Sequence, residues 1–273
     1  MNLIESIDQI RELVASIRAK RLGFITNFFL DEEKHQLWIE KGVFFYAQIS
    51  DSLFFIKKNN GFCNAFYSST TAVQLAEDLK ELNRNYPDDN FVFDIIGRDI
   101  QCQPVVEAFQ QAGYAEFCSL KRMSRITPEE SYNFDEAVSY AAGGDVKAIS
   151  ALLHSNFNEE AEQIPYDEEL NKYAANKQIL VCKMEGQIAG FLIYEKNAST
   201  LYLRYWFTNS DFRDKKVGSK LLRAFFKIGE ETKRQQLWVI QSNENAIVRY
   251  EHYGFKEENM YDIILSNKHL RGV

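Results

Sequence analysis

Hydrophobic positions along the chain follow two different periods, and each period marks a different kind of element. A stripe of apolar residues at helical spacing predicts an amphipathic helix over residues 3–19. Near-continuous apolar and aromatic runs over 43–67 then predict three strands joined by hairpin turns. Helical spacing returns over 70–85, where Thr70 or Thr71 is placed to cap the helix.

The remainder of the first half contains elements of both kinds. Residues 91–97 predict a buried strand, 103–114 a short helix that ends near Gly113, and 115–126 a strand or a pair of strands. Residues 126–136 are polar with weak periodicity, which is typical of a linker.

The second half repeats this plan. Its predicted elements are strand, two helices, hairpin, strand, helix, strand, helix and strand, over 137–142, 144–157, 167–176, 178–196, 199–210, 217–233, 234–241, 243–254 and 255–266. Segments 91–126 and 237–266 each run strand, short helix, glycine with an aromatic residue, and strand. The chain is therefore predicted to be an α/β protein with tandem domains over 1–128 and 136–273, each a mostly antiparallel mixed sheet flanked by helices.

Composition narrows the class of protein. The chain has 273 residues and a net charge of −7, and an acidic chain is a poor general binder of nucleic acid because phosphate contacts need clustered Lys and Arg. No apolar run approaches the roughly 20 residues of a membrane span, and no signal peptide opens the chain, so we expect a cytoplasmic protein. The four cysteines form no CxxC pair and have no histidine at metal-ligand spacing, so we expect buried reduced thiols and no metal.

A small basic turn leads into the helix predicted over 217–233. It contains Arg213, Lys215 and Lys216, and Gly218 follows. The first N–H groups of a helix lack intrahelical partners, and the helix dipole adds about half a positive charge there, so an anion can bind. A glycine lets the backbone approach such a ligand closely. The alternative is a solvated basic turn that only begins a core helix.

Two motifs in this half resemble those of the GNAT superfamily, the GCN5-related N-acetyltransferases. The family signature Arg/Gln-x-x-Gly-x-Gly/Ala is similar to Arg213–Ser219, with Lys216 in place of the first glycine. The family pattern Asn-x-x-Ala-x-x-x-Tyr-x-x-x-Gly-Phe matches Asn243, Ala246, Tyr250, Gly254 and Phe255. The resemblance covers residues 137–266 and implies a tandem GNAT protein, with a degenerate GNAT-like first domain.

The resemblance implies that acetyl-CoA is the co-substrate and that main-chain amides of the basic turn hold its pyrophosphate. It assigns contacts with the cofactor to Arg213, Lys215, Lys216, Val217, Gly218, Ser219 and Asn243. It also implies that the preceding strand splays from its neighbour at a bulge. Pantetheine would pair there with main-chain groups of Trp206, Phe207 and Thr208.

Two of these positions have a second interpretation. If Lys216 needs a positive φ, it costs roughly 1 kcal/mol or more, whereas with ordinary backbone geometry its ammonium could point at a phosphate. For Asn243 two roles are open: contact with the cofactor, or only a cap on the helix that follows. For Tyr250, the resemblance implies a phenol near the thioester sulfur that acts as general acid. The alternative is a core aromatic beside Tyr253 and Phe255.

The general base is left open, because the strand over 199–210 contains no glutamate where many relatives carry one. Candidates to line the acceptor cleft or to titrate there are Glu195, Arg204, Tyr205, His154 and His252, with a structural role expected for His154. Of two acidic runs, 158–170 is the better candidate for an acceptor pocket.

We therefore expect an N-acetyltransferase that moves an acetyl group from acetyl-CoA to a primary amine of a small molecule or peptide by direct attack. No nucleic-acid or membrane partner is expected, and the oligomeric state, a homodimer included, is left open. One alternative is a non-catalytic CoA-binding or regulatory module, and another is a Fem-type aminoacyl transferase, which the acidic charge disfavours. Residues 64–79 contain no glycine, Lys or Arg, so the first domain is expected not to bind CoA in the usual place. It would shape the acceptor side of the cleft or form an interface.

Overall fold

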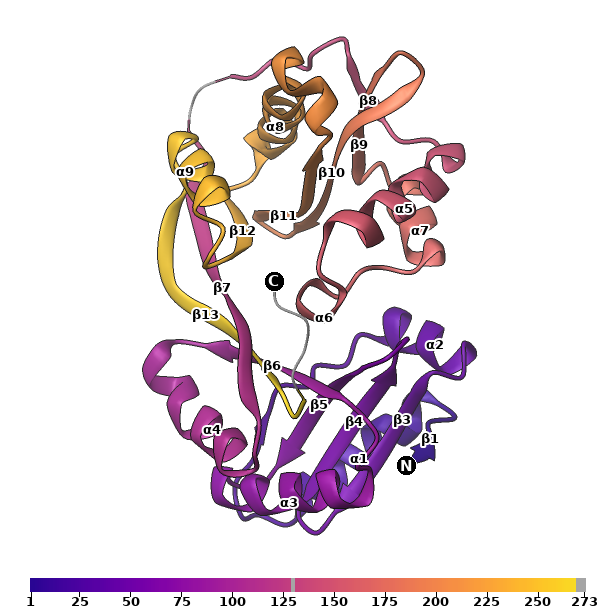
Figure 1. Ribbon diagram of the computed structural model, residues 1–273, viewed down its shortest axis with the longest axis vertical. Coiled ribbons are helices and arrows are strands. Elements are labelled where there is room, and N and C mark those ends of the chain that lie inside the picture. Colours follow the sequence, from indigo (N-terminus) through magenta and orange to yellow (C-terminus); the bar gives the residue numbers. More distant parts are fainter. Residues whose placement is uncertain (129–130, 269–273) are drawn as a thin grey trace. The chain divides into compact units, whose positions relative to one another are not determined.

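The structure is a computed structural model that describes residues 1–128 and 131–268 and, of Arg213, the main chain alone (Figure 1). The chain forms two compact units. Unit 1 combines Met1–Leu120 with Asn259–Val273, and unit 2 comprises Lys121–Glu258. Each unit contributes its own run of neighbouring strands to the sheet and has its own hydrophobic core.

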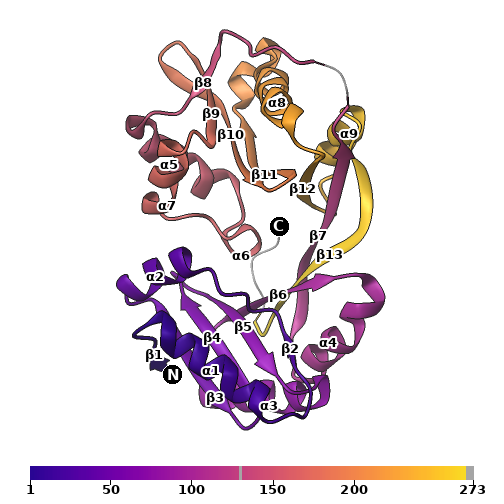
Figure 2. The same cartoon turned by 180° about the vertical axis from the view of Figure 1, so that it is seen from behind.

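Unit 1 is a mixed sheet with helices packed on it (Figure 2). Its strands are β1 (Asn2–Leu3), β2 (Ile25–Thr26), β3 (Phe44–Ile49), β4 (Ser52–Lys58), β5 (Cys63–Ser69), β6 (Phe91–Gly97) and the end of β13 (Lys256–Ser266). The order is β1-β3-β4-β5-β6-β13, and β2 pairs with β5. Its helices are α1 (Ile7–Ala19), α2 (Glu32–Glu40), α3 (Ala72–Asn85) and α4 (Asp99–Gln111).

The sequence accounts for most of unit 1. Thr71 caps α3, because its side chain accepts a hydrogen bond from the N–H of Gln74 at 3.1 Å. Leu75 and Leu79 of α3 are fully buried in the same core cluster as Phe93 of β6. The predicted strands over 43–67 and 91–97 are present, whereas α2 and β2 were not predicted.

The strands of unit 2 also pair in both parallel and antiparallel directions. Its strands are the end of β7 (Ala115–Ile126), β8 (Val138–Tyr140), β9 (Ile179–Met184), β10 (Gln187–Asn197), β11 (Thr200–Thr208) and β12 (Arg234–Ile240), in the order β7-β12-β11-β10-β9-β8. Its helices are α5 (Val146–Asn156), α6 (Glu159–Glu162), α7 (Asp167–Ala175), α8 (Val217–Ile228) and α9 (Glu244–His252). Short 3-10 turns lie at Gly143–Asp145, Ser210–Lys215 and Gly229–Glu231.

Strand β10 shows how the sheet of unit 2 is covered on both faces. Leu192 and Tyr194 belong to the core cluster that contains the apolar face of α8, while Phe191 and Ile193 belong to the cluster with α5 and α7. Successive side chains of a strand point to opposite faces, so this alternation places α8 on one face and α5 with α7 on the other (Figure 1). Strands β5–β6 and β11–β12 pair in parallel, and the hairpins are antiparallel. The predicted α/β class and mixed sheets are confirmed.

The boundaries of the units differ from the predicted domains 1–128 and 136–273. Tyr261–Ser266 of β13 pair with β6 and belong to unit 1, although the strand begins in unit 2. Conversely, β7 enters unit 2 at Lys121, which forms an ion pair with Glu257 at 2.8 Å. The reason is physical: hydrogen-bond partners decide to which unit a strand belongs, and a strand's own sequence does not show them.

Across residues 1–128 and 131–268, no helix is long and apolar enough to cross a membrane. In the same part of the chain, no three His, Cys, Asp or Glu side chains gather where they could hold a metal. The four cysteines are free thiols, of which Cys118 is half-buried and Cys63, Cys102 and Cys182 are buried.

Candidate active site

The strands β11 and β12 pair over their first residues and then separate. Their parallel register runs from Thr200↔Arg234 to Leu203↔Leu237, and both strands continue beyond it. On its other edge β11 carries a bulge, since Tyr194 lies opposite Leu203 but Ile193 lies opposite Tyr205, which leaves Arg204 as the extra residue. Strand β11 therefore presents an edge that β12 does not pair, beginning at the bulge.

The main-chain groups on this free edge can be assigned by alternation. The N–H of Asn209 donates to the carbonyl of Ala189 on β10, at 2.9 Å. The carbonyl of Phe207 also lies on that side, because its oxygen is 2.7 Å from the position that a Cβ atom would take if Gly190 had one. Since alternate residues of a strand bond to opposite edges, the main chain of Trp206 and Thr208 faces the open side. Of the three residues predicted to pair with pantetheine, Trp206 and Thr208 are the ones so oriented.

The N-terminus of α8 is open to a ligand. Lys216 precedes the helix in the left-handed conformation, with φ 55° and ψ 28°, and no side-chain hydrogen bond caps the helix there. The N–H of Lys220 donates to the carbonyl of Lys216, so the N–H groups of Val217, Gly218 and Ser219 precede the first helical bond. Lys216 thus has the positive φ that the first glycine of the family motif would adopt without strain.

Gly218 is needed for packing as well as for access. A Cβ at this position would lie 3.0 Å from Oγ1 of Thr208 and 3.0 Å from Cζ2 of Trp206. Both contacts are tighter than most real Cβ contacts, so a side chain here would require Thr208 or Trp206 to shift by a few tenths of an ångström. The first turn of α8 therefore sits directly against the free edge of β11 because position 218 is a glycine.

A cavity of about 550 Å³ lies between the first turn of α8, the end of β11 and α9. Its lining residues are Trp206, Thr208, Asn209, Ser210, Lys216, Gly218, Ser219, Val248, Arg249, His252 and Tyr253. Three of them carry Lys, Arg or His side chains, and none of the described lining residues is Asp or Glu. The cavity therefore combines a helix N-terminus with cationic side chains, which suits an anionic ligand.

Trp206, one of the lining residues, has an unusual buried polar group. Its Nε1 atom is buried and has no hydrogen-bond partner among the described residues. A buried N–H that donates to nothing costs free energy, so a ligand that accepts this bond would gain from it. The Trp206 ring also packs at 5.6 Å, between centroids, from the ring of Tyr250.

Other predicted residues have different roles. The side chain of Val217 is fully buried in the core, so only its main chain faces a ligand, and exposed Lys215 is not part of the cavity lining. Asn243 caps α9, since its Oδ1 accepts from the N–H of Ala246 at 3.1 Å, and it too lies outside the lining. The side chain of Arg213 lies outside the described part of the chain.

Arg249 lines the cavity but was not singled out from the sequence. It precedes Tyr250 on α9 and shares a helix face with His252, three residues later. That spacing, on a helix whose Tyr250 points into the core, is the signal that could have found it. A polar face opposite a buried residue is also typical of any surface helix, which is why the signal is weak by itself.

Tyr250 is a buried phenol, with 7% of its surface exposed. Burial raises its pKa, the negative charge of Glu162 raises it further, and Arg249 partly offsets both effects. Its hydroxyl makes no hydrogen bond to any described residue. Tyr250 is therefore a protonated, unengaged donor at neutral pH, although it also packs against Trp206 and Phe255 as a core aromatic would.

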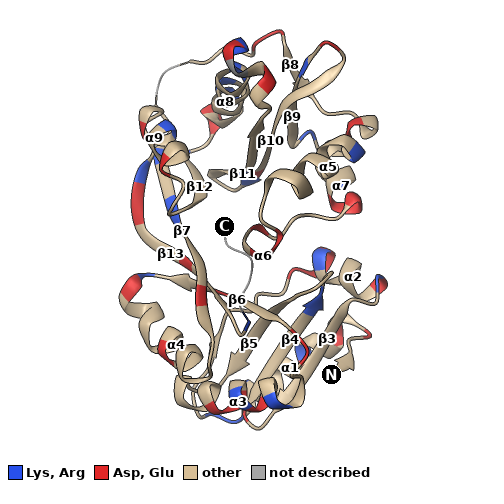
Figure 3. Cartoon of the chain, viewed as in Figure 1, with Lys and Arg blue, Asp and Glu red and all other residues tan. Residues whose placement is uncertain are grey.

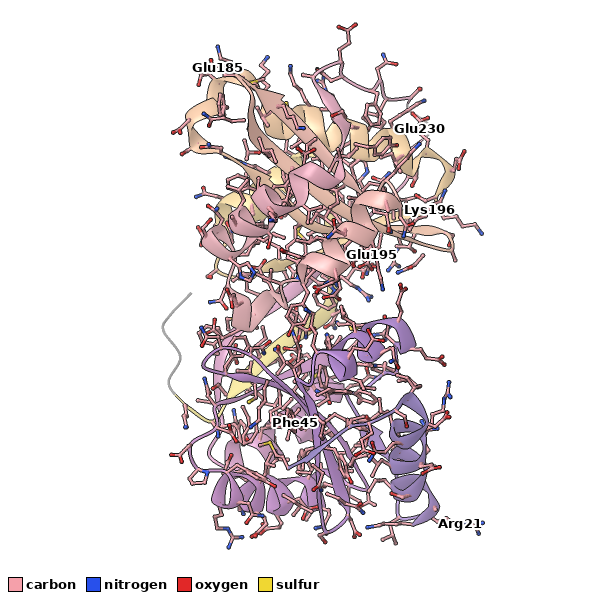
Figure 4. All side chains as sticks on the ribbon, turned by 90° about the vertical axis from the view of Figure 1, so that its right-hand side faces the viewer. Arg21, Phe45, Glu185, Glu195, Lys196 and Glu230 are labelled. Carbon is pink, nitrogen blue, oxygen red and sulfur yellow. The ribbon has the colours of Figure 1, made fainter. Side chains whose placement is uncertain are left out.

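Of the residues expected at the acceptor side, Glu195 and Arg204 lie in one cluster, together with Tyr173. Glu195, labelled on β10 in Figure 4, accepts a hydrogen bond from the hydroxyl of Tyr173 at 2.5 Å. Its Oε1 also lies 3.6 Å from Nε of Arg204, the residue of the bulge. Because Glu195 is held by both groups, it is a poor choice for a free base. Tyr205, which is 2% exposed, donates instead to main-chain carbonyls of the α6 segment.

The two histidines named from the sequence lie in different surroundings. His252 lines the cavity, on the same face of α9 as Arg249. His154 is an exposed side chain on α5 whose Nδ1 is paired with Glu159. His154 does not line the cavity, and its pairing is that of a surface residue.

Unit 1 also contains two paired strands that separate, but there a side chain of the protein itself lies between them. Strands β5 and β6 pair from Cys63↔Phe91 to Ala65↔Phe93 and then diverge. Asn27 lies between them: its Oδ1 accepts from the N–H of Tyr67 on β5 at 2.6 Å, and its Nδ2 donates to the carbonyl of Asp94 on β6 at 2.9 Å. The side chain of Asn27 thus bonds to both strands where unit 2 leaves an open edge.

Comparisons with known proteins agree with this geometry. Residues 146–255 match the acetyltransferase (GNAT) family. A GCN5-related N-acetyltransferase from Sphaerobacter thermophilus is 12% identical with a TM-score of 0.60, over 81% of this chain and 78% of that one. A GNAT-family acetyltransferase from Colwellia psychrerythraea is 13% identical with a TM-score of 0.56, over 97% and 98%. No curated protein matches the sequence.

A third solved structure bears on the tandem arrangement. A tandem GNAT protein from the clavulanic acid biosynthesis pathway is 10% identical with a TM-score of 0.56, over 79% of this chain and 78% of that one. Identities this low show the fold alone. The family match covers residues 146–255 alone, so it assigns that segment to the GNAT family, while the solved structures, a tandem GNAT protein included, show a fold like that of this chain. The match over 146–255 supports acyl transfer as the general class of reaction.

Proposed function

We propose that the protein is an N-acetyltransferase that moves an acetyl group from acetyl-CoA to a primary amine. One observation carries the proposal: the cavity at the open N-terminus of α8 adjoins the unpaired edge of β11 and is lined by Lys216, Arg249 and His252 without a carboxylate. Such a site matches a ligand that has phosphates at one end and amides along its length.

The residues present fit that ligand. The N–H groups at the start of α8 and the ammonium of Lys216 would hold phosphate oxygens. The main chain of Trp206 and Thr208 would pair with amide groups, as one strand pairs with another.

Acetyl-CoA, when bound, supplies the acyl group as an activated thioester. The chain's own contribution is to orient the ligand and to manage protons. Tyr250 keeps its proton at neutral pH because burial raises its pKa, and its hydroxyl is free to give that proton to a leaving sulfur atom. The low exposure of Tyr250 also keeps water away from the proton it donates.

For unit 1 we infer that no CoA binds between β5 and β6. Asn27 and β2 already occupy the edge of β5, with Thr26 also donating to the carbonyl of Tyr67 at 2.6 Å. A ligand would have to displace these bonds before it could pair with the strand.

The test is a calorimetric titration of the purified protein with acetyl-CoA, run beside the variant Gly218→Asp. We expect micromolar binding by the wild type and its loss in the variant, because the new side chain clashes with Trp206 and Thr208 and brings a negative charge to an anion site. The control is Gly144→Asp, the same change at a glycine with nothing within 4 Å of an added Cβ. Failure of the folded wild type to bind would leave a non-catalytic role with a GNAT fold.

A further inference from the structure

The bulge of β11 turns Arg204 to the face of the sheet that lies away from α8. Trp206 packs against the core cluster that contains α8, whereas Tyr205 belongs to the cluster with α5 and α7. Arg204 is the extra residue of the bulge, and its Nε lies 3.6 Å from Oε1 of Glu195. The same oxygen accepts a hydrogen bond from the hydroxyl of Tyr173 on α7. The guanidinium of Arg204 is therefore on the α7 side of the sheet.

Arg204 lies at the point where two strands separate. The last pair between β11 and β12 is Leu203↔Leu237, so Arg204 is the first residue of β11 beyond it. Trp206, which lines the cavity beside α8, is two residues further, or roughly 7 Å along the strand. Because β12 does not cover the edge of β11 here, a group bound on the face of Arg204 can reach that edge directly.

The guanidinium of Arg204 is held in place, while its N–H groups are still available. Its Cζ lies 5.7 Å from the ring centre of Tyr202 and 5.6 Å from that of Tyr205, and a cation is attracted to such rings. The 3.6 Å approach to Glu195 is longer than a hydrogen bond, and Arg204 makes no hydrogen bond of ordinary geometry to a described residue. With 27% of the side chain exposed, a ligand can reach these donors. Their planar fork suits a carboxylate, which accepts two parallel N–H bonds.

The neighbouring guanidinium groups are already satisfied. Nε of Arg122 on β7 donates to one oxygen of Glu258, and Nη1 of Arg234 on β12 lies 3.5 Å from the other. The side-chain amide of Gln236, in the orientation that satisfies both arginines, also accepts from Nη2 of Arg234 at 3.1 Å. Arg204 is the one charged residue in the sequence of β11, as the colours of that strand in Figure 3 show. It differs from Arg122 and Arg234 in lacking a hydrogen-bond acceptor among the described residues.

We propose that Arg204 binds a carboxylate of the acceptor, so that the acceptor belongs to the class of amino acids, which carry an amine and a carboxylate together. This inference rests on the proposed acetyl transfer and names the class of its second substrate. The cavity proposed for acetyl-CoA adjoins α8, and Arg204 lies on the opposite face of the sheet. The carboxylate is therefore assigned to the molecule that arrives separately, and not to the acyl group.

The bound carboxylate takes part in orientation and is not consumed. The amine nitrogen forms a C–N bond to the acyl carbon as the C–S bond breaks. The proton that the nitrogen loses is balanced by the one that the sulfur takes up. Arg204 thus acts by placing the amine, which lowers the entropic cost of the reaction.

The experiment uses pairs of acceptors that differ by one carboxylate: L-lysine with 1,5-diaminopentane, and L-leucine with 3-methylbutylamine. The ratio of kcat/KM within each pair is compared between proteins, so that the different basicity of the two amines cancels. We expect this ratio to fall by ~100-fold in Arg204→Gln and by ~10-fold in Arg204→Lys, which keeps the charge without the fork. The control is Arg234→Gln, which leaves Glu258 its bond to Arg122 and should change the ratio by less than about twofold.

Two equilibrium measurements accompany the kinetics. Acetyl-CoA affinity, measured by calorimetry, is expected to be the same for all four proteins. Protein saturated with CoA is then titrated with the product N-acetyl-L-leucine, which should bind the wild type and Arg234→Gln alike and Arg204→Gln at least ~10-fold more weakly. Equal affinity of Arg204→Gln and the wild type for this product would contradict the inference.

The other outcomes separate this inference from the proposed function. An unchanged ratio in both Arg204 variants, or an equal fall for both members of each pair, would show that Arg204 only supports the sheet, and acetyl transfer would stand. A preference of the wild type for succinyl-CoA over acetyl-CoA that Arg204→Gln loses would move the carboxylate to the acyl group and overturn the acceptor class. A wild type that binds acetyl-CoA but acetylates no amino acid would do the same. A wild type that does not bind acetyl-CoA would overturn both proposals.

Discussion

The hydroxyl of Tyr253 donates a hydrogen bond to Oγ of Ser219, with 2.9 Å between the two oxygens. Ser219 lies in the first turn of α8, and Tyr253 directly follows α9. Both residues line the cavity proposed to bind acetyl-CoA. The bond therefore connects the two helices that form opposite walls of one site.

Removal of this bond should weaken both the fold and the site. Tyr253→Phe keeps the ring, which packs on Phe226, and deletes the donor. We expect the free energy of unfolding to fall by about 1 kcal/mol, measured with urea, and acetyl-CoA affinity to fall several-fold, measured by calorimetry. The control is Tyr46→Phe in unit 1, where the hydroxyl makes no hydrogen bond to a described residue. A loss of stability with unchanged affinity would mean that the bond does not shape the site.

Tyr250→Phe tests the proton donor. The ring stays, so its packing against Trp206 and Phe255 is retained, while the hydroxyl is lost. We expect turnover to fall by ~10²-fold or more with acetyl-CoA affinity unchanged, because the donor acts on the leaving sulfur alone. Steady-state kinetics beside calorimetry separate the two effects. An unchanged kcat would remove Tyr250 from the reaction and leave it as a core aromatic.

Lys216→Gly should change stability and affinity in opposite directions. A positive φ is strained for lysine and not for glycine, so relief of the strain outweighs the flexibility that glycine adds to the unfolded chain. We expect stability to rise by up to about 1 kcal/mol and acetyl-CoA affinity to fall, since an ammonium is lost from the cavity. The adjacent Lys215→Gly, at a residue without positive φ, should lower stability by about 0.5–1 kcal/mol. A gain of affinity in Lys216→Gly would show that Lys216 obstructs the site.

Much of unit 2 could be predicted from the sequence, because the signals for its elements lie in short stretches of the chain. The helix at 217–228 and the glycine at its first turn follow from apolar spacing and from Gly218. The same reasoning left two geometries of Lys216 open, since one residue type does not fix φ. It named the acidic run 158–170 as a candidate acceptor pocket but singled out no residue within it. The hydrogen bond from Tyr205 to the main-chain carbonyl of Glu162, more than forty residues away, appears only in the structure.

The sequence is less informative where contacts between distant segments determine the local structure. The segment that contains β2 has little periodicity, and its two paired residues form a strand because β5 offers them an unpaired edge. Asn27, beside it, gives no signal of its role in the sequence. Its bonds to Tyr67 and Asp94 appear only once the strands are placed.

Asn27 should be a large contributor to the stability of unit 1. Asn27→Ala removes an acceptor for the N–H of Tyr67 and a donor to the carbonyl of Asp94. We expect a loss of about 2 kcal/mol in the free energy of unfolding, measured with urea. Asn27→Asp keeps an acceptor for Tyr67 and, at a pH where its other oxygen is protonated, also a donor to Asp94, so it should lose little stability there. Equal stability of Asn27→Ala and wild type would show that β5 and β6 hold their places without this bridge.

Asp262 predicts a pH dependence of stability. Burial raises the pKa of its carboxyl well above the usual value, and the charge of Asp94 raises it further. Because the pKa is raised in the folded state, Asp262 contributes fully to the free energy of unfolding below its unfolded pKa of about 4. This contribution is lost as the pH rises through the folded pKa. Asp262→Asn should therefore raise the free energy of unfolding by roughly 1–2 kcal/mol at neutral pH.

The same variant should bring no gain near pH 4 or below, where Asp262 is protonated in both states. Urea unfolding at both pH values checks this sign. Glu116→Gln, at an exposed position of β7, is the control and should change stability little at either pH. A gain of equal size at both pH values would mean that packing, and not charge, explains the effect.

The course of β13 has a consequence for how the two repeats can be taken apart. Unit 1 is discontinuous in sequence, because Tyr261–Ser266 belong to it although they follow the whole of unit 2 along the chain. A single proteolytic cut at 126–136 therefore cannot release it intact: the N-terminal fragment would leave β6 with a bare edge, ready to pair with another chain. Unit 2, residues 121–258, is one continuous stretch, so of the two units it is unit 1 that needs chain from both sides of the other.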